Sequence, residues 1–278
     1  MPASRALKRM WMVVGIALAS YLVLCFVARV AYPRVLFPAP RLDRAPSIDD
    51  PDARLVELPH ADGSRTVALH YPAPPGARTV VVFHGNGETM FDDRRHATEL
   101  KRRGLGVLLV EYRGYGTTCG SAPTEEMLYE DGEVAIAHLT SQHVPMDRIA
   151  LWGWSLGSGV AAEMARRGHG TRLVLLAPFT SAPDMGRRFA PILPVSLLMS
   201  HRLDTLSKAP AIKQPTLVVH GDADELIPIA MGEAVAKALP DAKLVRVEGG
   251  HHADLLYSED GRPGARELYD LLADHLAH

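Results

Sequence analysis

The sequence has little cysteine and no net positive charge. Only two cysteines occur in 278 residues, Cys25 and Cys119, and their very different settings argue against a disulfide framework and against a metal site. Lysine and arginine total 30 against 32 acidic residues, so no net positive charge favours nucleic acid as a partner. Internal repeats and low-complexity tracts are also missing. A chain of this length buries one good-sized core, and we expect one folded domain.

Charge is absent from one long stretch near the N-terminus. Residues 10–28 carry no charged side chain, and a helix of that length reaches about 28 Å, which spans the hydrocarbon core of a bilayer. Arg5, Lys8 and Arg9 precede the stretch. The pattern predicts a cytoplasmic N-terminus over residues 1–9 and a single-pass transmembrane signal anchor over residues 10–28.

The charge distribution around this anchor also predicts its orientation. The basic N-terminus places the following domain on the extracytoplasmic side, which is the periplasm if the protein is bacterial. Arginines at positions 29, 34, 41 and 44 weaken the asymmetry. A cleaved signal peptide is the alternative, since Ala17-Leu18-Ala19 has the small-x-small form. Cleavage there would leave only half of the apolar run in the signal, so we favour the uncleaved anchor.

The remaining chain alternates between strand and helix patterns. Residues 29–53, which are rich in proline, are predicted to be an extended linker, and residues 54–278 form the domain. An antiparallel hairpin is expected at the sheet edge, followed by strands that alternate with helices. The pattern predicts an α/β fold with a mostly parallel sheet, helices on both faces, and a site at the carboxyl ends of the strands. The predicted strands are 54–58, 66–71, 79–83, 106–111, 148–152, 172–177, 216–220 and 243–247, and the predicted helices include 88–103, 124–142, 229–239 and 264–277.

A serine lies between one of these strands and a helix. The motif Gly153-Trp154-Ser155-Leu156-Gly157 follows an apolar strand and leads into a run of small residues typical of a helix. This layout is that of a nucleophile elbow, in which a sharp turn exposes one serine hydroxyl at the end of the sheet. The two glycines indicate that the turn has no room for side chains. Ser155 is therefore the candidate nucleophile, and the free N–H of Leu156 at the helix start is a candidate oxyanion donor.

A serine nucleophile needs a base, and the base needs an acid to orient it. The strand predicted over 216–220 is followed by Asp222 and Asp224, and the last strand is followed by His251 and His252. Serine, then aspartate, then histidine is the chain order of a known triad architecture. The residues alone leave two candidates for the acid and two for the base.

Several ordered motifs together resemble the α/β-hydrolase superfamily. The resemblance is specifically to its membrane-anchored branch, which includes serine depalmitoylases, lysophospholipase-like enzymes and many bacterial hydrolases. It covers most of the domain. The matching motifs are Phe83-His84-Gly85-Asn86, Tyr112-Arg113-Gly114-Tyr115-Gly116, Ser121-Ala122-Pro123-Thr124-Glu125-Glu126, Gly153-Trp154-Ser155-Leu156-Gly157, His220-Gly221 with Asp224 and Ile227-Pro228, and the turn at 249–254.

This resemblance implies specific roles for individual residues. Asp224 matches the family's acid, and Asp222 is the alternative, more simply explained as a turn carboxylate. Anchoring the last turn on Asp254 makes His252 the base, whereas anchoring it on the two preceding glycines would favour His251. We assign His252. The backbone N–H of Asn86 would complete the oxyanion hole with that of Leu156. We expect His84 to have a packing and loop-fixing role and Arg113 to hold its own loop in shape.

The implied function is a serine hydrolase that cleaves carboxylic esters or thioesters, including lipid acyl substrates, through an acyl-enzyme. No metal or organic cofactor is expected. The alternatives are a catalytically silent membrane-tethered binding module, and an acyltransferase or peptidase that uses the same triad. We expect the remaining histidines to be solvated surface residues, including His60, His96, His138, His201 and His275.

The region that could cover the site is short. About thirty residues separate Phe179-Thr180-Ser181 from Gln214, which leaves room for a short lid and not for a large cap domain. Residues 189–199 within it are unusually apolar. We expect this stretch to line an acyl-chain groove or to touch the bilayer, although such runs are as often ordinary core.

Overall fold

A central sheet of eight strands organises the domain in the computed structural model, which describes residues 2–118, 122–256 and 265–278. The strand order is β1-β2-β4-β3-β5-β6-β7-β8. The β1–β2 and β2–β4 pairs are antiparallel and all other pairs are parallel, which confirms the predicted hairpin at one edge of a mostly parallel sheet. The strands are β1 (Arg54–Pro59), β2 (Arg65–Tyr71), β3 (Thr79–Phe83), β4 (Gly106–Val110), β5 (Ile149–Trp154), β6 (Leu173–Leu176), β7 (Thr216–Gly221) and β8 (Ala242–Val247).

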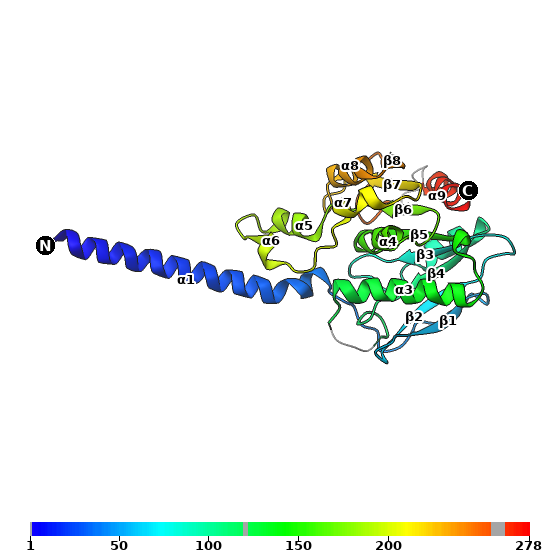
Figure 1. Ribbon diagram of the computed structural model, residues 1–278, viewed down its shortest axis with the longest axis horizontal. Coiled ribbons are helices and arrows are strands. Elements are labelled where there is room, and N and C mark those ends of the chain that lie inside the picture. The colour runs from blue at the N-terminus through cyan, green and yellow to red at the C-terminus, as the bar shows by residue number, and fades with distance from the viewer. Residues whose placement is uncertain (1, 119–121, 257–264) are drawn as a thin grey trace.

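Helices cover both faces of this sheet (Figure 1). Every residue of β3 is buried, and alternate side chains enter opposite layers, because successive residues of a strand point to opposite faces. One layer packs against α3, α4 and α8, and the other packs against α2 and α9. The described helices are α1 (Pro2–Leu36), α2 (Arg94–Arg102), α3 (Glu125–Ser141), α4 (Leu156–Arg166), α5 (Ala182–Phe189), α6 (Val195–Leu198), α7 (Thr205–Lys208), α8 (Ile229–Ala238) and α9 (Ala265–Ala277), with short 3₁₀ turns at Met146–Arg148 and Ala209–Ala211.

The N-terminal helix is longer than the sequence pattern predicts. It continues through Pro33 to Leu36, so residues 29–36, assigned above to the extended linker, are helical. A proline near the end of a helix costs only one backbone hydrogen bond, and the N–H of Phe37 closes the last turn by donating to Pro33 O at 2.8 Å. The helix projects away from the domain (Figure 1), and it is long and apolar enough to cross a membrane, as a membrane anchor or a signal sequence would be.

Two further expectations need correction. Helix α2 begins at Arg94 and not near residue 88, because the N–H and hydroxyl of Thr89 donate to Asp92 and form a turn there. His60 and His96 are buried and are not solvated surface residues. His96 stacks on Trp154 with ring centroids 5.5 Å apart, and burial lowers its pKa to about 4. Cys119 and Ser121 lie outside the described residues.

Candidate active site

Ser155 lies at a strained turn between β5 and α4. Its backbone has φ 49° and ψ −115°, a conformation that non-glycine residues adopt only where the surrounding structure enforces it. The flanking glycines show what enforces it. A Cβ atom on Gly153 would lie 2.3 Å from Gly157 O, and one on Gly157 would lie 2.0 Å from Phe83 O. The turn therefore has no space for either side chain, as the sequence indicated.

The structure brings Ser155, His252 and Asp224 together. His252 Nε2 lies 3.1 Å from Ser155 Oγ, and His252 Nδ1 lies 2.8 Å from Asp224 Oδ2. The three side chains come from the ends of β5, β7 and β8, which are parallel and therefore terminate at one edge of the sheet. Ser155 is buried and retains 7% of its accessible surface.

The carboxylate of Asp224 is held by several donors. Its Oδ1 accepts hydrogen bonds from the N–H groups of Leu226 (2.9 Å) and Ile227 (2.7 Å). Burial alone would raise the pKa of Asp224, but the contacts with His220, with His252 and with the Ile227 N–H hold the pKa well below its ordinary value. Asp224 is therefore ionised at neutral pH beside His252.

His220 is a residue of this site that the sequence analysis did not assign a role. Its Nε2 lies 2.8 Å from Ile227 O and 3.4 Å from Asp224 Oδ2, and its ring packs against Gly232, where a Cβ would approach Nδ1 to 2.3 Å. The ring of His220 therefore holds the loop that carries Asp224 in place. Its place directly before Gly221 at the end of β7 was the available signal, because the resemblance included this pair.

The alternative acid and base point elsewhere. Asp222 Oδ1 accepts a hydrogen bond from the N–H of Gly249 at 2.7 Å, so this carboxylate joins two loops. His251 Nδ1 lies 2.7 Å from Glu225 Oε1, and this ion pair is exposed. Neither side chain approaches Ser155 in the hydrogen bonds of the described residues.

The two backbone groups predicted to bind an oxyanion lie on adjacent elements. Leu156 is the first residue of α4, so its N–H has no acceptor one turn back. Asn86 follows Gly85, which packs so closely on the elbow that a Cβ there would lie 3.3 Å from Trp154 Cδ1. Among the described residues, the Asn86 N–H makes no backbone hydrogen bond outside helices and strands. Their role as oxyanion donors beside Ser155 stays a prediction.

A buried pair fixes the loop that carries Asn86. His84 Nε2 lies 3.0 Å from Glu111 Oε1, and both side chains are fully buried. Burial would lower the pKa of His84, but the Glu111 carboxylate raises it above the ordinary value. Glu111 also fills the space beside Gly116, where a Cβ would lie 2.1 Å from Oε2. This contact explains the loop-fixing role expected for His84, and Glu111 is its partner that sequence reasoning missed.

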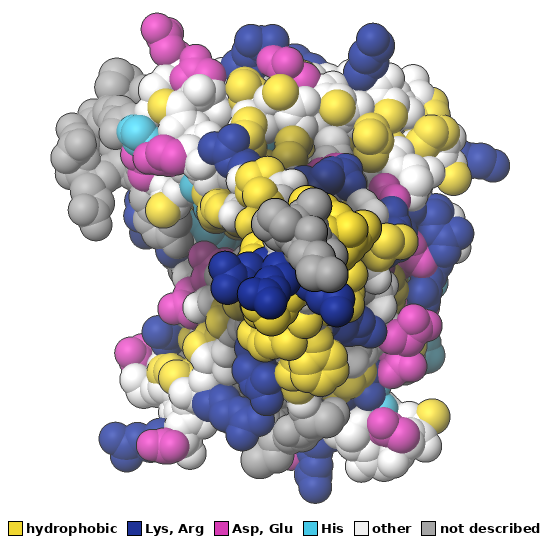
Figure 2. Space-filling view, turned by 90° about the vertical axis from the view of Figure 1, so that its left-hand side faces the viewer, with side chains coloured by type: hydrophobic (Ala, Val, Ile, Leu, Met, Phe, Trp, Pro, Cys, Tyr) yellow, Lys and Arg dark blue, Asp and Glu magenta, His cyan; other side chains and the backbone are white. Residues whose placement is uncertain are grey.

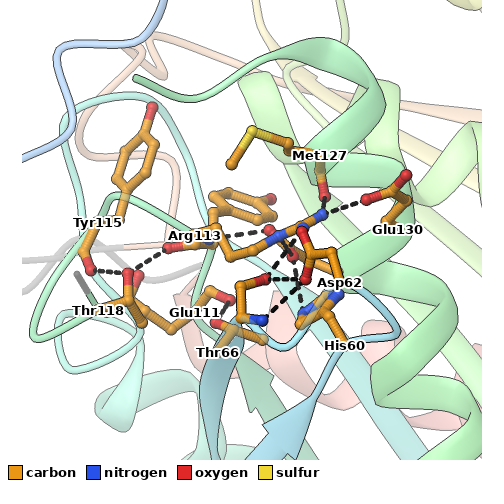
Figure 3. A network of polar contacts seen from close by, with 12 residues as sticks. His60, Asp62, Thr66, Glu111, Arg113, Tyr115, Thr118, Met127 and Glu130 are labelled. Atoms are coloured by element: carbon orange, nitrogen blue, oxygen red, sulfur yellow. Dashed lines mark hydrogen bonds and ion pairs between the residues drawn. The ribbon is translucent and has the colours of Figure 1, made fainter. Parts of the chain in front are cut away.

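Arg113 anchors its own loop through a polar network (Figure 3). Its Nε donates to Asp131 Oδ1 at 2.6 Å and its backbone N–H donates to Asp131 Oδ2 at 2.8 Å. Its Nη2 contacts Glu130 and the carbonyl of Met127 on α3. Burial raises the pKa of Asp131 to about 7, although Arg113 opposes this shift. The network ties the loop after β4 to α3 and to the turn between β1 and β2.

Known proteins share this architecture. A family model described as serine aminopeptidase, S33, matches residues 74–203, and one described as TAP-like protein matches residues 199–261. An uncharacterised protein of Mycobacterium tuberculosis is 34% identical over 208 residues, covering 73% of this chain and 74% of that protein. An alpha/beta hydrolase domain-containing protein of Caenorhabditis elegans is 31% identical over 192 residues, which cover 66% of this chain and 55% of that longer protein.

A solved structure gives the same fold. The esterase of Pyrococcus furiosus superposes with a TM-score of 0.69 at 18% identity, covering 86% of this chain and 97% of the esterase. The sheet order and the strained serine turn at the end of β5 are consistent with the fold that these matches indicate. The chain belongs to the α/β-hydrolase superfamily.

Proposed function

We propose that the protein is a serine hydrolase that cleaves carboxylic esters or thioesters through an acyl-enzyme. Ser155 Oγ attacks the acyl carbonyl carbon while its proton passes to His252 Nε2. The tetrahedral intermediate then collapses, the carbon–oxygen or carbon–sulfur bond breaks, and the leaving group takes the proton from His252. Water attacks the acyl-enzyme by the same route and restores the serine.

The contact between Ser155 Oγ and His252 Nε2, at 3.1 Å, carries this proposal. It lies within the distance over which a base can take the hydroxyl proton. Asp224, ionised because its pKa is lowered, accepts from Nδ1 and stabilises the imidazolium that forms.

The N–H groups of Asn86 and Leu156 donate hydrogen bonds to the acyl oxygen, on which negative charge develops. Each such donor contributes about 3 kcal/mol to transition-state stabilisation in comparable sites. The N-terminus of α4, directed at the same point, adds its positive partial charge.

The N-terminal helix gives the proposed enzyme its location. We place residues 1–9 in the cytoplasm, residues 10–28 across the membrane and the catalytic domain on the extracytoplasmic side. The support is the uncharged run and the basic residues before it. A protease added to intact cells or spheroplasts tests this placement, because only an extracytoplasmic domain would be digested.

A fluorophosphonate probe tests the chemistry. The native protein is expected to react covalently, and Ser155→Ala is expected to lose the label, whereas Asp222→Asn keeps it. Hydrolysis of p-nitrophenyl acetate should follow the same pattern. An unlabelled native protein with an intact fold would instead favour a catalytically silent module tethered to the membrane.

A second candidate is peptide-bond hydrolysis, which the description of the first matching family model favours. The same triad serves either acyl group. Parallel assays with an aminoacyl p-nitroanilide and the corresponding p-nitrophenyl ester distinguish them, since a peptidase would cleave both and an enzyme restricted to esters would leave the anilide intact.

A further inference from the structure

The apolar segment, residues 189–199, runs from the last residue of α5 through α6 and exposes large hydrophobic side chains. Phe189 is 64% exposed, Ile192 is 72% exposed and Leu197 is 84% exposed. Figure 2 looks toward the projecting end of α1 and shows hydrophobic side chains gathered on this face of the molecule. Clustered exposed apolar groups of this kind mark a surface that has a partner.

Two hydroxyl groups of α1 hold the apolar segment alongside the helix. The hydroxyl of Tyr21 donates to Ile192 O at 2.9 Å, at the tip of the segment. The Tyr32 hydroxyl lies 2.7 Å from Ser200 Oγ and accepts from the Ser200 N–H at 3.0 Å, where the segment returns to the domain. Helix α6 packs against α1 between these two points. The segment therefore runs beside the N-terminal helix.

This attachment fixes the depth of Ile192 if α1 spans a bilayer. The uncharged run extends from residue 10 to residue 28, with no length to spare across a hydrocarbon core of about 30 Å. Arg29 therefore marks the boundary, and Tyr21 lies about 12 Å inside it at 1.5 Å per residue. The carbonyl of Ile192, which accepts a hydrogen bond from the Tyr21 hydroxyl, lies at a similar depth. Tyr32 lies on the aqueous side of Arg29, at the level where tyrosine is enriched.

Most backbone N–H groups of the apolar segment are paired within the protein, those of Ile192 and Ser196 not being among the backbone donors of the described residues. Lipid offers no hydrogen-bond partners, so irregular backbone enters it only when its polar groups are satisfied internally. Pro191 and Pro194 have no N–H, and the Tyr21 hydroxyl satisfies the carbonyl at the tip. The backbone N–H groups that donate within the segment or to the end of α5 are those of Ala190, Leu193, Val195, Leu197, Leu198 and Met199.

Charge at the base of the apolar segment fits a lipid surface. No acidic residue occurs from 185 to 203, whereas Arg187 and Arg188 precede the segment directly and are exposed, Arg187 in an ion pair with Asp184. Basic side chains next to an apolar surface are attracted to anionic lipid headgroups. Arg188 also donates to Glu225 O at 3.1 Å, in the residue after Asp224. The segment thus extends from the membrane level to the loop that carries the acid.

We propose that the apolar segment inserts into the bilayer beside α1 and that the enzyme takes substrates whose acyl chain is embedded in that bilayer. This inference rests on the proposed anchor and on the proposed hydrolase activity. The inserted segment holds the mouth of the site against the lipid, so an acyl ester or thioester reaches Ser155 from the membrane. Water-soluble short esters reach the same serine without this contact.

Environment-sensitive probes on the full-length protein in vesicles of phosphatidylcholine and phosphatidylglycerol test the insertion. In a background of Cys25→Ala and Cys119→Ala, an NBD group is attached at Ile192→Cys, at Val14→Cys in α1 and at Leu55→Cys on β1. Leu55, 44% exposed at the far edge of the sheet, is the matched aqueous control. The Ile192 and Val14 probes should show blue-shifted emission and quenching by nitroxide-labelled acyl chains, and the Leu55 probe should be quenched by aqueous iodide.

The outcomes separate the parts of the proposal without any catalytic assay. An Ile192 probe that iodide quenches as strongly as the Leu55 probe, with Val14 still in lipid, would overturn the insertion alone. A Val14 probe in water would overturn the anchor and, with it, the insertion. Neither result would affect the fluorophosphonate test of Ser155.

A kinetic comparison tests the substrate class. For Phe189→Ser/Ile192→Ser, the kcat/KM for p-nitrophenyl palmitate in vesicles, divided by that for p-nitrophenyl acetate in solution, should fall about tenfold, because two apolar side chains leave the lipid contact. Leu55→Ser should keep the native ratio. An unchanged ratio in the double variant would show that hydrolysis of lipid-embedded substrate does not depend on the apolar segment.

Discussion

The serine turn and the apolar segment differ in what covers their atoms. Around Ser155, every residue of β5 and nearly every residue of α4 is buried by the domain itself. In the apolar segment, Ile192 and Leu197 are exposed by 72% and 84%. The domain itself buries the serine turn, and this packing enforces its strained backbone. The apolar segment is not covered by protein, so its partner lies outside the chain.

The adjacent histidines give the largest expected effect within the covered region. On the proposed mechanism, His252→Ala removes the base and should lower the kcat for p-nitrophenyl acetate by about 10⁴-fold or more. His251→Ala removes only an exposed contact with Glu225 and should change the rate by less than about threefold. Steady-state hydrolysis by the two purified variants measures both. Equal losses would show that the two histidines share the role.

A methyl group tests how completely the turn is filled. Gly157→Ala places Cβ 2.0 Å from the backbone oxygen of Phe83, so the backbone must move, and the free energy of unfolding should fall by about 3 kcal/mol or more. Gly159→Ala is the matched control, because its Cβ would meet side chains and no backbone atom, those of Leu203 at 3.3 Å and Phe179 at 3.7 Å. That change should lie within about 1 kcal/mol of native stability, since alanine also favours the helix. Urea unfolding followed by tryptophan fluorescence distinguishes the two.

Glu163, on the same helix α4, should make the stability of the buried region depend on pH. Burial would raise the pKa of Glu163, but hydrogen bonds from Arg166, Arg167 and Lys208 lower it from 4.5 to about 2. A folded-state pKa below the unfolded one means that the pairing stabilises the protein above about pH 4.5 and is lost as the pH falls toward 2. Glu163→Gln should therefore cost about 2 kcal/mol at pH 7, and the difference from native should shrink below pH 4.5. A pH-independent difference would contradict this assignment.

The parts of the fold that the sequence predicts are those that local pattern determines. Strands β3 and β5 are almost entirely apolar, β7 contains Leu217-Val218-Val219, and the elbow combines a strand, a Gly-x-Ser-x-Gly turn and a helix of small residues. Ser155 could be singled out for that reason. The choice between His251 and His252 could not be derived from pattern, because both lie in one turn and the direction of each side chain depends on the path of the backbone through Gly249, where φ is 63°.

Other misses come from contacts between distant parts of the chain. Nothing near His96 in sequence reveals that Trp154 and Tyr269 will enclose it. Tyr32, in the part of α1 beyond residue 28, contacts Ser200, and Phe37, just after the helix, contacts the ring of His201; both contacts span more than 160 residues. Local proline content predicted an extended linker there, whereas the helix continues through Pro33 to Leu36.

The smallest expected effect is the stability change on altering the uncovered region. Leu197 belongs to neither buried cluster, so Leu197→Ser should change the free energy of unfolding of the domain by less than about 0.5 kcal/mol. Leu203→Ser, six positions on at a fully buried site, should cost about 3 kcal/mol, because it removes a core side chain and buries a hydroxyl. Urea unfolding in detergent, followed through the buried Trp152 and Trp154, measures both variants. A loss at Leu197 as large as that at Leu203 would mean that the apolar segment is part of the core, and the contrast between the two regions would disappear.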